Sequence, residues 1–110
     1  MKLLTQEIRE ALPKLYETEE IKLNQKVVIA KYFCGSFTWY VIEGEEREDG
    51  DFLFWGYVKN EADNFCSEFG YFTLSQLEEL TLENRRKLPF IERDLHFQPR
   101  KLIELLGRKF

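Results

Sequence analysis

Runs of β-branched and aromatic residues fill the middle of the chain and predict an antiparallel sheet. The predicted strands are Lys26–Phe33, Phe37–Glu43, Asp51–Val58 and the shorter Glu68–Thr73. Their connections are short, whereas parallel neighbours would need a crossover of about a dozen residues or more. The pattern therefore predicts a meander in which Asp51–Val58 is the central strand.

The central strand carries large apolar side chains on both of its faces. Alternation separates them into two sets, Phe52, Phe54 and Val58 on one face and Leu53, Trp55 and Tyr57 on the other. A sheet with one face in water would instead alternate apolar with polar residues. Two interpretations follow: helices cover both faces, or one face is an exposed aromatic surface that binds a partner.

Leucine spacing predicts about three short helices. Thr5–Leu12 begins with an N-cap threonine. Ser75–Leu80 begins with a capping-box pattern, Ser75 followed three residues later by Glu78. The third helix begins at Pro99 and ends near Leu106, before Gly107.

Alternation in Ile91–Phe97 predicts a fifth strand. The predicted fold class is therefore α+β, a single domain with an antiparallel meander sheet of four to five strands and about three short helices packed on it.

Composition narrows the class of protein. The 110 residues carry a net charge of −4, with 44% hydrophobic and 33% charged residues, which is typical of one globular domain. Residues 1–80 are strongly acidic and residues 81–110 are net basic. An acidic body argues against broad binding of a phosphate backbone.

The chain shows no targeting segment and no run of about 20 apolar residues, so we expect a cytoplasmic protein. Its cysteines, Cys34 and Cys66, lie far apart and are expected to be reduced thiols. They lack metal-ligand spacing, and we expect no cofactor and no metal.

The charged connection Gly44–Gly50 is the first candidate site. It holds the acidic residues Glu45, Glu46, Glu48 and Asp49. These carboxylates would meet a partner with a basic surface, while Trp39 and Trp55 on the adjoining strands would supply aromatic anchors. The alternative interpretation is a solvated hairpin turn.

Three titratable residues form a second candidate site. Glu92, Asp94 and His96 alternate, so a regular strand would point all three to one face. Two carboxylates and an imidazole are suited to acid–base catalysis. The solvent face of a strand gives the same pattern without any chemistry.

A third interpretation is binding of single-stranded nucleic acid, in which aromatic rings stack on bases. The candidate rings are Trp39, Tyr40, Trp55, Tyr57, Tyr71 and Phe72. The candidate cations are Arg85, Arg86, Lys87 and Arg100. Ordinary core packing explains the same aromatic residues.

Five segments of the chain together resemble a bacterial family of small domains of unknown function. They are MKLLTQEIREALPKLYETEE, VVIAKYF with WYVIEGE, GDFLFWGYV, EFGYFTLSQLEEL and IERDLHFQPRKLIELL. The resemblance covers nearly the whole chain and departs from the family pattern at Asn60–Ser67 and Asn84–Lys87. This family is common on plasmids, conjugative elements and phages. The resemblance thus implies a setting on mobile DNA, and it supplies no catalytic residue.

Three functional hypotheses follow, in order of preference. The first is a non-enzymatic protein-binding module of a mobile element, such as an inhibitor of a CRISPR effector or restriction enzyme. The second is a nucleic-acid-binding accessory protein of DNA transfer. The third is a small enzyme that uses Glu92, Asp94 and His96.

Overall fold

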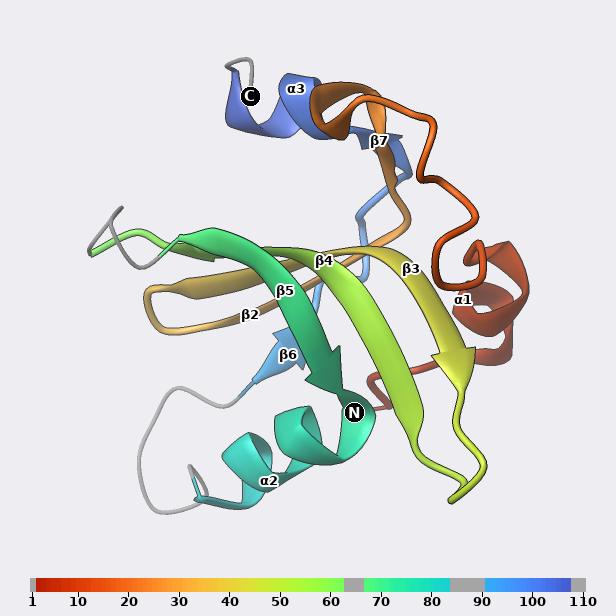
Figure 1. Cartoon of the computed structure of the whole chain (residues 1–110). Helices are drawn as coiled ribbons and strands as arrows, with labels where there is room; N and C mark the ends of the chain where they lie inside the picture. Colours follow the sequence, from red (N-terminus) through yellow and green to blue (C-terminus); the bar gives the residue numbers. More distant parts are fainter. Residues whose placement is uncertain (1, 63–66, 84–90, 108–110) are drawn as a thin grey trace.

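The structure is a computed structural model that describes residues 2–62, 67–83 and 91–107. Its elements are α1 (Gln6–Ala11), the 3-10 helix η1 (Leu23–Gln25), β1 (Val27–Val28), β2 (Ala30–Cys34), β3 (Phe37–Glu46), β4 (Phe52–Asn60), β5 (Glu68–Thr73), α2 (Leu74–Glu83), β6 (Glu92–Arg93), β7 (Arg100–Lys101) and α3 (Leu102–Leu106). A five-stranded antiparallel sheet has the order β5-β4-β3-β2-β6, and β1 pairs with β7 in a second, two-stranded sheet (Figure 1). The predicted α+β class is confirmed.

The predicted meander is confirmed in β2 to β5, where each strand pairs antiparallel with the next. The strand Glu68–Thr73 has the predicted bounds. The hairpin of β3 and β4 is longer than predicted, because β3 continues to Glu46 and β4 to Asn60. The predicted turn Gly44–Gly50 is therefore partly strand, and only its tip lies beyond the ladder.

The prediction of one continuous strand over Lys26–Phe33 is wrong. The chain breaks at Ile29 between β1 and β2. Val28 is buried on one side of the large sheet, whereas Ala30 and Tyr32 are buried on the other. A regular strand would keep these alternate residues on one face, so the break lets the chain change sides.

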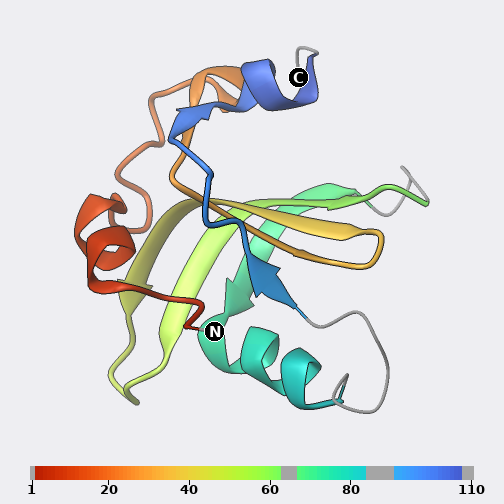
Figure 2. The same cartoon turned by 180° about the vertical axis from the view of Figure 1, so that it is seen from behind.

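The prediction of a strand over Ile91–Phe97 is also wrong in extent. Only β6 pairs with β2, and the chain then leaves the sheet toward β7 (Figure 2). The Asp94 carboxylate accepts a hydrogen bond from the His96 backbone N–H at 3.0 Å, a local turn that competes with the ladder. The last helix begins at Leu102 rather than Pro99, while its predicted end at Gly107 is confirmed by a left-handed φ of 67°.

Helices cover both faces of the large sheet, as the first of the two interpretations predicts. On one face, α1 and α2 pack around a cluster that includes Phe52, Phe54 and Leu77. On the other face, Leu102 of α3 is fully buried in a second cluster that includes Tyr57 of β4. In Figure 1 the sheet lies between α2 below and α3 above.

Side-chain caps fix where the first two helices begin. The Oγ1 atom of Thr5 accepts from the Ile8 backbone N–H at 3.2 Å, which confirms it as the N-cap of α1. The predicted capping box of Ser75 with Glu78 is wrong, because the box that begins α2 is Thr73 with Gln76, two residues earlier. The Ser75 hydroxyl donates to Asp51 at 2.6 Å, and this hydrogen bond lowers the pKa of the Asp51 carboxyl.

A β-bulge interrupts the pairing of β3 with β4. Val41 lies opposite Gly56 and Glu43 lies opposite Trp55, so Ile42 is the extra residue. Beside the bulge the strands approach so closely that a Cβ on Gly56 would lie 1.9 Å from the Tyr40 carbonyl oxygen. Glycine at this position is therefore a steric requirement of the hairpin.

The replacement Gly56→Ala is expected to lower the free energy of unfolding by more than about 3 kcal/mol, because the overlap is with backbone that cannot turn aside. Urea denaturation followed by circular dichroism measures this change. Gly70→Ala is the matched control, since Gly70 pairs directly with Gly56 and a Cβ there meets nothing within 4 Å. Equal losses in the two variants would contradict the steric explanation.

Candidate functional site

An open pocket of about 600 Å³ lies between the segment 16–26 and the face of the sheet that carries Trp55. We call it the aromatic pocket. Its lining residues are Tyr16, Glu19, Ile21, Lys22, Leu23, Lys26, Glu43, Trp55 and Tyr71. Within the described part of the chain, four of the eight exposed large apolar side chains line it, namely Tyr16, Ile21, Leu23 and Tyr71. Its size is in the range of about 300–1,000 Å³ that is typical of ligand sites.

The floor of the aromatic pocket contains a buried carboxylate, Glu43. The bulge at Ile42 brings Glu43 opposite Trp55, so that both lie on the same face of the sheet. If the pairing continued regularly after Val41, Ile42 would lie opposite Trp55, and Glu43 would lie opposite Phe54 and face the apolar cluster on the other side. The bulge therefore supplies the polar group of the pocket.

The Glu43 carboxylate holds the segment that forms the rim. Its oxygens accept hydrogen bonds from the backbone N–H groups of Tyr16, at 2.9 Å, and Thr18, at 3.1 Å. They also accept a hydrogen bond from the Thr18 hydroxyl. Hydrogen bonds to a charged acceptor are about twice as strong as neutral ones, so they fix a segment without regular secondary structure.

Lys26 is the buried cation that balances Glu43. Its ammonium donates to the Thr18 carbonyl and, at 2.9 Å, to the Thr18 hydroxyl oxygen. Thr18 thus bridges the two charges. The ammonium also lies 5.5 Å from the centre of the Trp55 ring, a cation–π contact. Burial of these charges is tolerable because each one has hydrogen-bond partners.

Two tyrosines from distant parts of the chain meet at the rim of the aromatic pocket. Tyr16 has a φ of 72°, which is a strained conformation for a bulky residue. The Tyr71 hydroxyl donates to the Tyr16 hydroxyl at 3.2 Å. This hydrogen bond raises the pKa of Tyr71, and the charges of Glu43 and Glu19 add to the shift. Both rings remain largely in solvent, at 61% and 52% exposure.

The structure separates the two tryptophans that were predicted as anchors. Trp39 is only 8% exposed and belongs to the core on the opposite face, so the prediction of an exposed anchor there is wrong. Its neighbours alternate regularly before the bulge, which directs the ring inward. Trp55 lines the aromatic pocket and stacks on Phe69, with ring centres 5.4 Å apart.

The four residues of the predicted acidic site also have different surroundings in the structure. Glu45 lies within β3, and its carboxylate accepts from the Leu15 backbone N–H at 3.0 Å, so this residue helps to hold the rim segment. Glu46, the last residue of β3, and Glu48 and Asp49 in the turn beyond it are exposed. We call these three residues the acidic tip.

Glu92, Asp94 and His96 line one shallow pocket together with Lys31. They do not share the face of a regular strand, because only Glu92 belongs to β6. The Asp94 carboxylate forms an ion pair with Lys31, at 3.8 Å, in addition to its bond with the His96 N–H. Among the described residues, no three acidic, histidine or cysteine side chains are grouped as a metal site would require.

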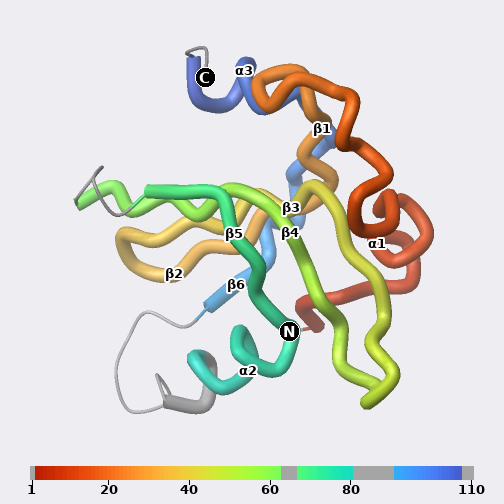
Figure 3. The backbone as a smooth tube through the Cα atoms, viewed as in Figure 1, coloured from red at the N-terminus to blue at the C-terminus, as the bar shows by residue number. Residues whose placement is uncertain are grey.

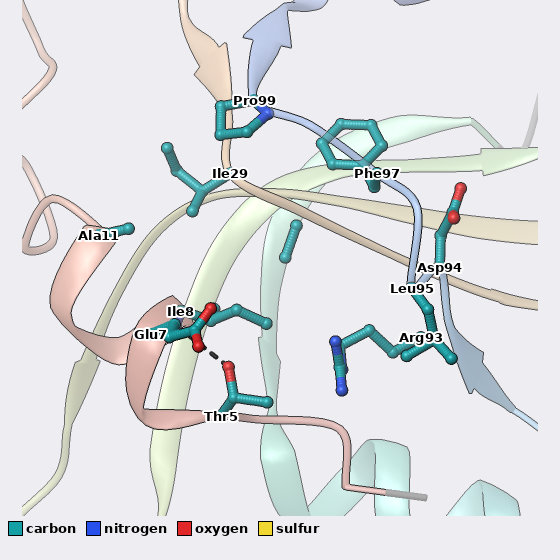
Figure 4. A pocket seen from close by; sticks show the side chains of 11 residues that line it. Thr5, Glu7, Ile8, Ala11, Ile29, Arg93, Asp94, Leu95, Phe97 and Pro99 are labelled. Carbon is teal, nitrogen blue, oxygen red and sulfur yellow. Dashed lines mark hydrogen bonds between the residues drawn. The ribbon is translucent and has the colours of Figure 1, made fainter.

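A smaller pocket of about 250 Å³ lies beside this turn, between α1 and the connection from β6 to β7 (Figure 4). Ile8, Ile29 and Phe97 form apolar walls, and the Arg93 side chain extends toward α1. Its volume is below the usual range of ligand sites. We interpret it as an imperfectly filled contact between elements.

Most of the aromatic rings in the nucleic-acid hypothesis are not accessible for stacking on bases. Trp39, Tyr40, Tyr57 and Phe72 are buried. Arg100 is exposed in β7 and lies 3.4 Å from Glu104. Arg85, Arg86 and Lys87 lie outside the described residues, as does Cys66, while Cys34 is half-buried at the end of β2. The nucleic-acid hypothesis itself stays a prediction.

Sequence reasoning missed Lys26, Thr18 and Tyr16 as parts of a site. One signal was available, since Lys26 opens an apolar strand pattern and Glu43 ends another. The bulge that places Glu43 on the same face as Trp55, near Lys26, had no signal in the sequence.

The chain matches the family model described as "Protein of unknown function (DUF2958)" over residues 3–106, and it therefore belongs to this family. No curated protein and no solved structure matches it. In the described residues, none of the helices has the length and apolar character needed to span a bilayer.

The buried charges are expected to behave as one unit. Glu43→Gln should lower the free energy of unfolding by about 3 kcal/mol, because it leaves the Lys26 charge uncompensated. The double variant Lys26→Met with Glu43→Gln should lose clearly less than the sum of the two single losses. Denaturation of all three variants measures the coupling. Glu45→Gln serves as the control for a half-exposed carboxylate, and additive losses at Lys26 and Glu43 would contradict the bridge through Thr18.

Proposed function

We propose that this member of the DUF2958 family is a non-enzymatic protein-binding module that docks its partner on the aromatic pocket. The observation that carries the proposal is the gathering of Tyr16, Ile21, Leu23 and Tyr71 around one hollow. Single exposed apolar residues need no explanation, but a cluster of them marks an interaction surface. Tyrosine and tryptophan are also the residues that dominate the binding energy of protein interfaces.

Rigidity of the rim supports a binding role. The segment that carries Tyr16 is tied to Glu43 and Glu45 by hydrogen bonds, and η1 is tied to the C-terminal segment. Figure 3 shows the orange segment before β1 beside α3 above the sheet, where η1 and α3 are in contact. A surface that is already ordered loses little conformational entropy when it binds, which increases affinity.

Charge supports a partner with a basic surface. The acidic tip is exposed, and the net charge of the chain is −4. Such a surface speeds the association with a basic partner and discriminates against acidic ones. Nucleases present basic surfaces to their substrates. The chain also resembles a family that is common on mobile DNA. Together with the acidic tip, this resemblance leads us to propose a host defence nuclease, such as a CRISPR effector or restriction enzyme, as the partner.

The polar groups of the pocket favour binding over catalysis. The Glu43 carboxylate accepts three hydrogen bonds, and the Lys26 ammonium donates to Thr18. A general base or nucleophile would have to be available to a substrate, whereas these groups are buried and engaged with each other.

Affinity capture from nuclease-treated host lysate, read by mass spectrometry, tests the proposal. A partner retained by the native protein should be lost or reduced at least tenfold with Tyr71→Ala, because the ring is an exposed anchor with little structural role. Leu95→Ala is the control, since Leu95 is 60% exposed and lies away from the aromatic pocket.

The same assay examines the acidic tip. Reversal of Glu46, Glu48 and Asp49 to lysine should weaken capture and flatten its salt dependence. Glu45 is left unchanged because it holds the Leu15 N–H. Capture that survives Tyr71→Ala undiminished, or that disappears with nuclease treatment, would overturn the proposed function.

A further inference from the structure

We propose that Tyr16 and Tyr71 form an oxidation site, at which a one-electron oxidant joins the two rings in an intramolecular dityrosine bond. The hydroxyl oxygens of these side chains lie 3.2 Å apart, although the residues are 55 positions apart in the sequence. The inference concerns a covalent modification of the rim, and it does not depend on the proposed partner.

Exposure singles out this pair among the tyrosines. All five tyrosines of the chain lie in the part that the structure describes. The side chains of Tyr16 and Tyr71 are more than half exposed, whereas Tyr32, Tyr40 and Tyr57 are buried. An oxidant in solution acts on rings that meet solvent, so oxidation of the folded protein should begin at Tyr16 or Tyr71.

Both members of the pair are held in place by the backbone. The Tyr16 backbone N–H donates to the Glu43 carboxylate at 2.9 Å, and Tyr71 is paired with Trp55 in the sheet. Reacting groups that a fold holds side by side behave as if each were present at a very high concentration. Coupling within one molecule should therefore outpace coupling between two molecules.

The reaction balances with the loss of two electrons and two protons. Each phenol gives up one electron and its hydroxyl proton, and the resulting phenoxyl radical shares its unpaired electron with the ring carbons beside the hydroxyl. One such carbon of each ring, a Cε atom, forms the new carbon–carbon bond. Each Cε hydrogen then moves as a proton to its phenolic oxygen, which restores both rings and both hydroxyl groups. The hydroxyl contact already brings together the ring edges that carry these carbons.

The new bond would fasten the segment between α1 and η1 to the edge strand β5. A cross-link between distant positions of the chain restricts the unfolded state more than the folded one. The Tm of the oxidised protein should therefore rise by about 10 °C or more. A lower Tm would show that the folded protein does not present the two rings for coupling.

The test is light-driven oxidation of the purified protein with tris(bipyridine)ruthenium(II) and persulfate, in which persulfate accepts the two electrons and becomes sulfate. The expected product is a monomer with dityrosine fluorescence. After reduction of any disulfide, its mass should be lower than that of the native protein by two hydrogen atoms. Peptide mapping should place the bond between Tyr16 and Tyr71, and the yield should not change when the protein is diluted about tenfold.

Conservative variants identify the rings that react. Tyr16→Phe and Tyr71→Phe each remove one of the two phenols and should lower the yield of the fluorescent monomer at least about tenfold. Tyr40→Phe is the matched control, because it removes a buried phenol and should leave the yield unchanged. Circular dichroism before oxidation establishes that each variant is folded.

Oxidation in urea distinguishes the folded arrangement from simple accessibility. The unfolded chain exposes all five tyrosines and no longer holds Tyr16 beside Tyr71, so the share of this bond among all dityrosine bonds should fall at least about fivefold. An equal share in urea, a product that consists of cross-linked dimers, or a yield that neither Tyr16→Phe nor Tyr71→Phe reduces would each overturn the inference. None of these measurements involves the partner, so failure of the proposed function would leave the oxidation site intact.

Discussion

The carboxylate of Glu43 is the constraint on which the arrangement of this protein depends. A buried charge is costly unless hydrogen bonds and an opposite charge compensate for it, and here the compensation comes from one short segment. Because Glu43 requires the N–H groups of Tyr16 and Thr18, the chain between α1 and η1 must run beside β3 at this point. Lys26 completes the network from the other end of that segment.

The position of the aromatic pocket follows from this network. The segment that Glu43 holds carries Tyr16 in a strained backbone conformation, and the hydrogen bonds on either side supply the energy that keeps it there. Tyr71 and Trp55 come from neighbouring strands of the sheet, where they are direct cross-strand partners. Two tyrosines far apart in the sequence thereby meet at one rim, and the pocket that they help to line remains open to solvent.

The fold could be predicted from the sequence more completely than the site. Alternating aromatic residues predicted the meander and both faces of β4, and Thr5 and Gly107 marked helix ends correctly. Two predicted strands were too long, one that passes through Ile29 and one that continues after Arg93. In both cases the local pattern favoured a continuous strand, but the strand pairing in the folded protein stops earlier. The site depended on an extra residue, Ile42, that exchanges the faces of Glu43 and its neighbours. A bulge inside an apolar run leaves no mark in the alternation, so the sequence did not show that Glu43 shares a face with Trp55.

Amide hydrogen exchange of the native protein tests most directly whether Glu43 holds the rim segment. The backbone N–H groups of Tyr16 and Thr18 lie outside any regular helix or strand, yet we predict protection comparable to that of amides paired within β4. The Ala62 N–H, which donates to the Asn60 side chain at 3.1 Å in a solvent-exposed hydrogen bond, provides the reference for a weakly held loop amide. Exchange of the Tyr16 and Thr18 amides as fast as that of Ala62 would contradict the central role of Glu43.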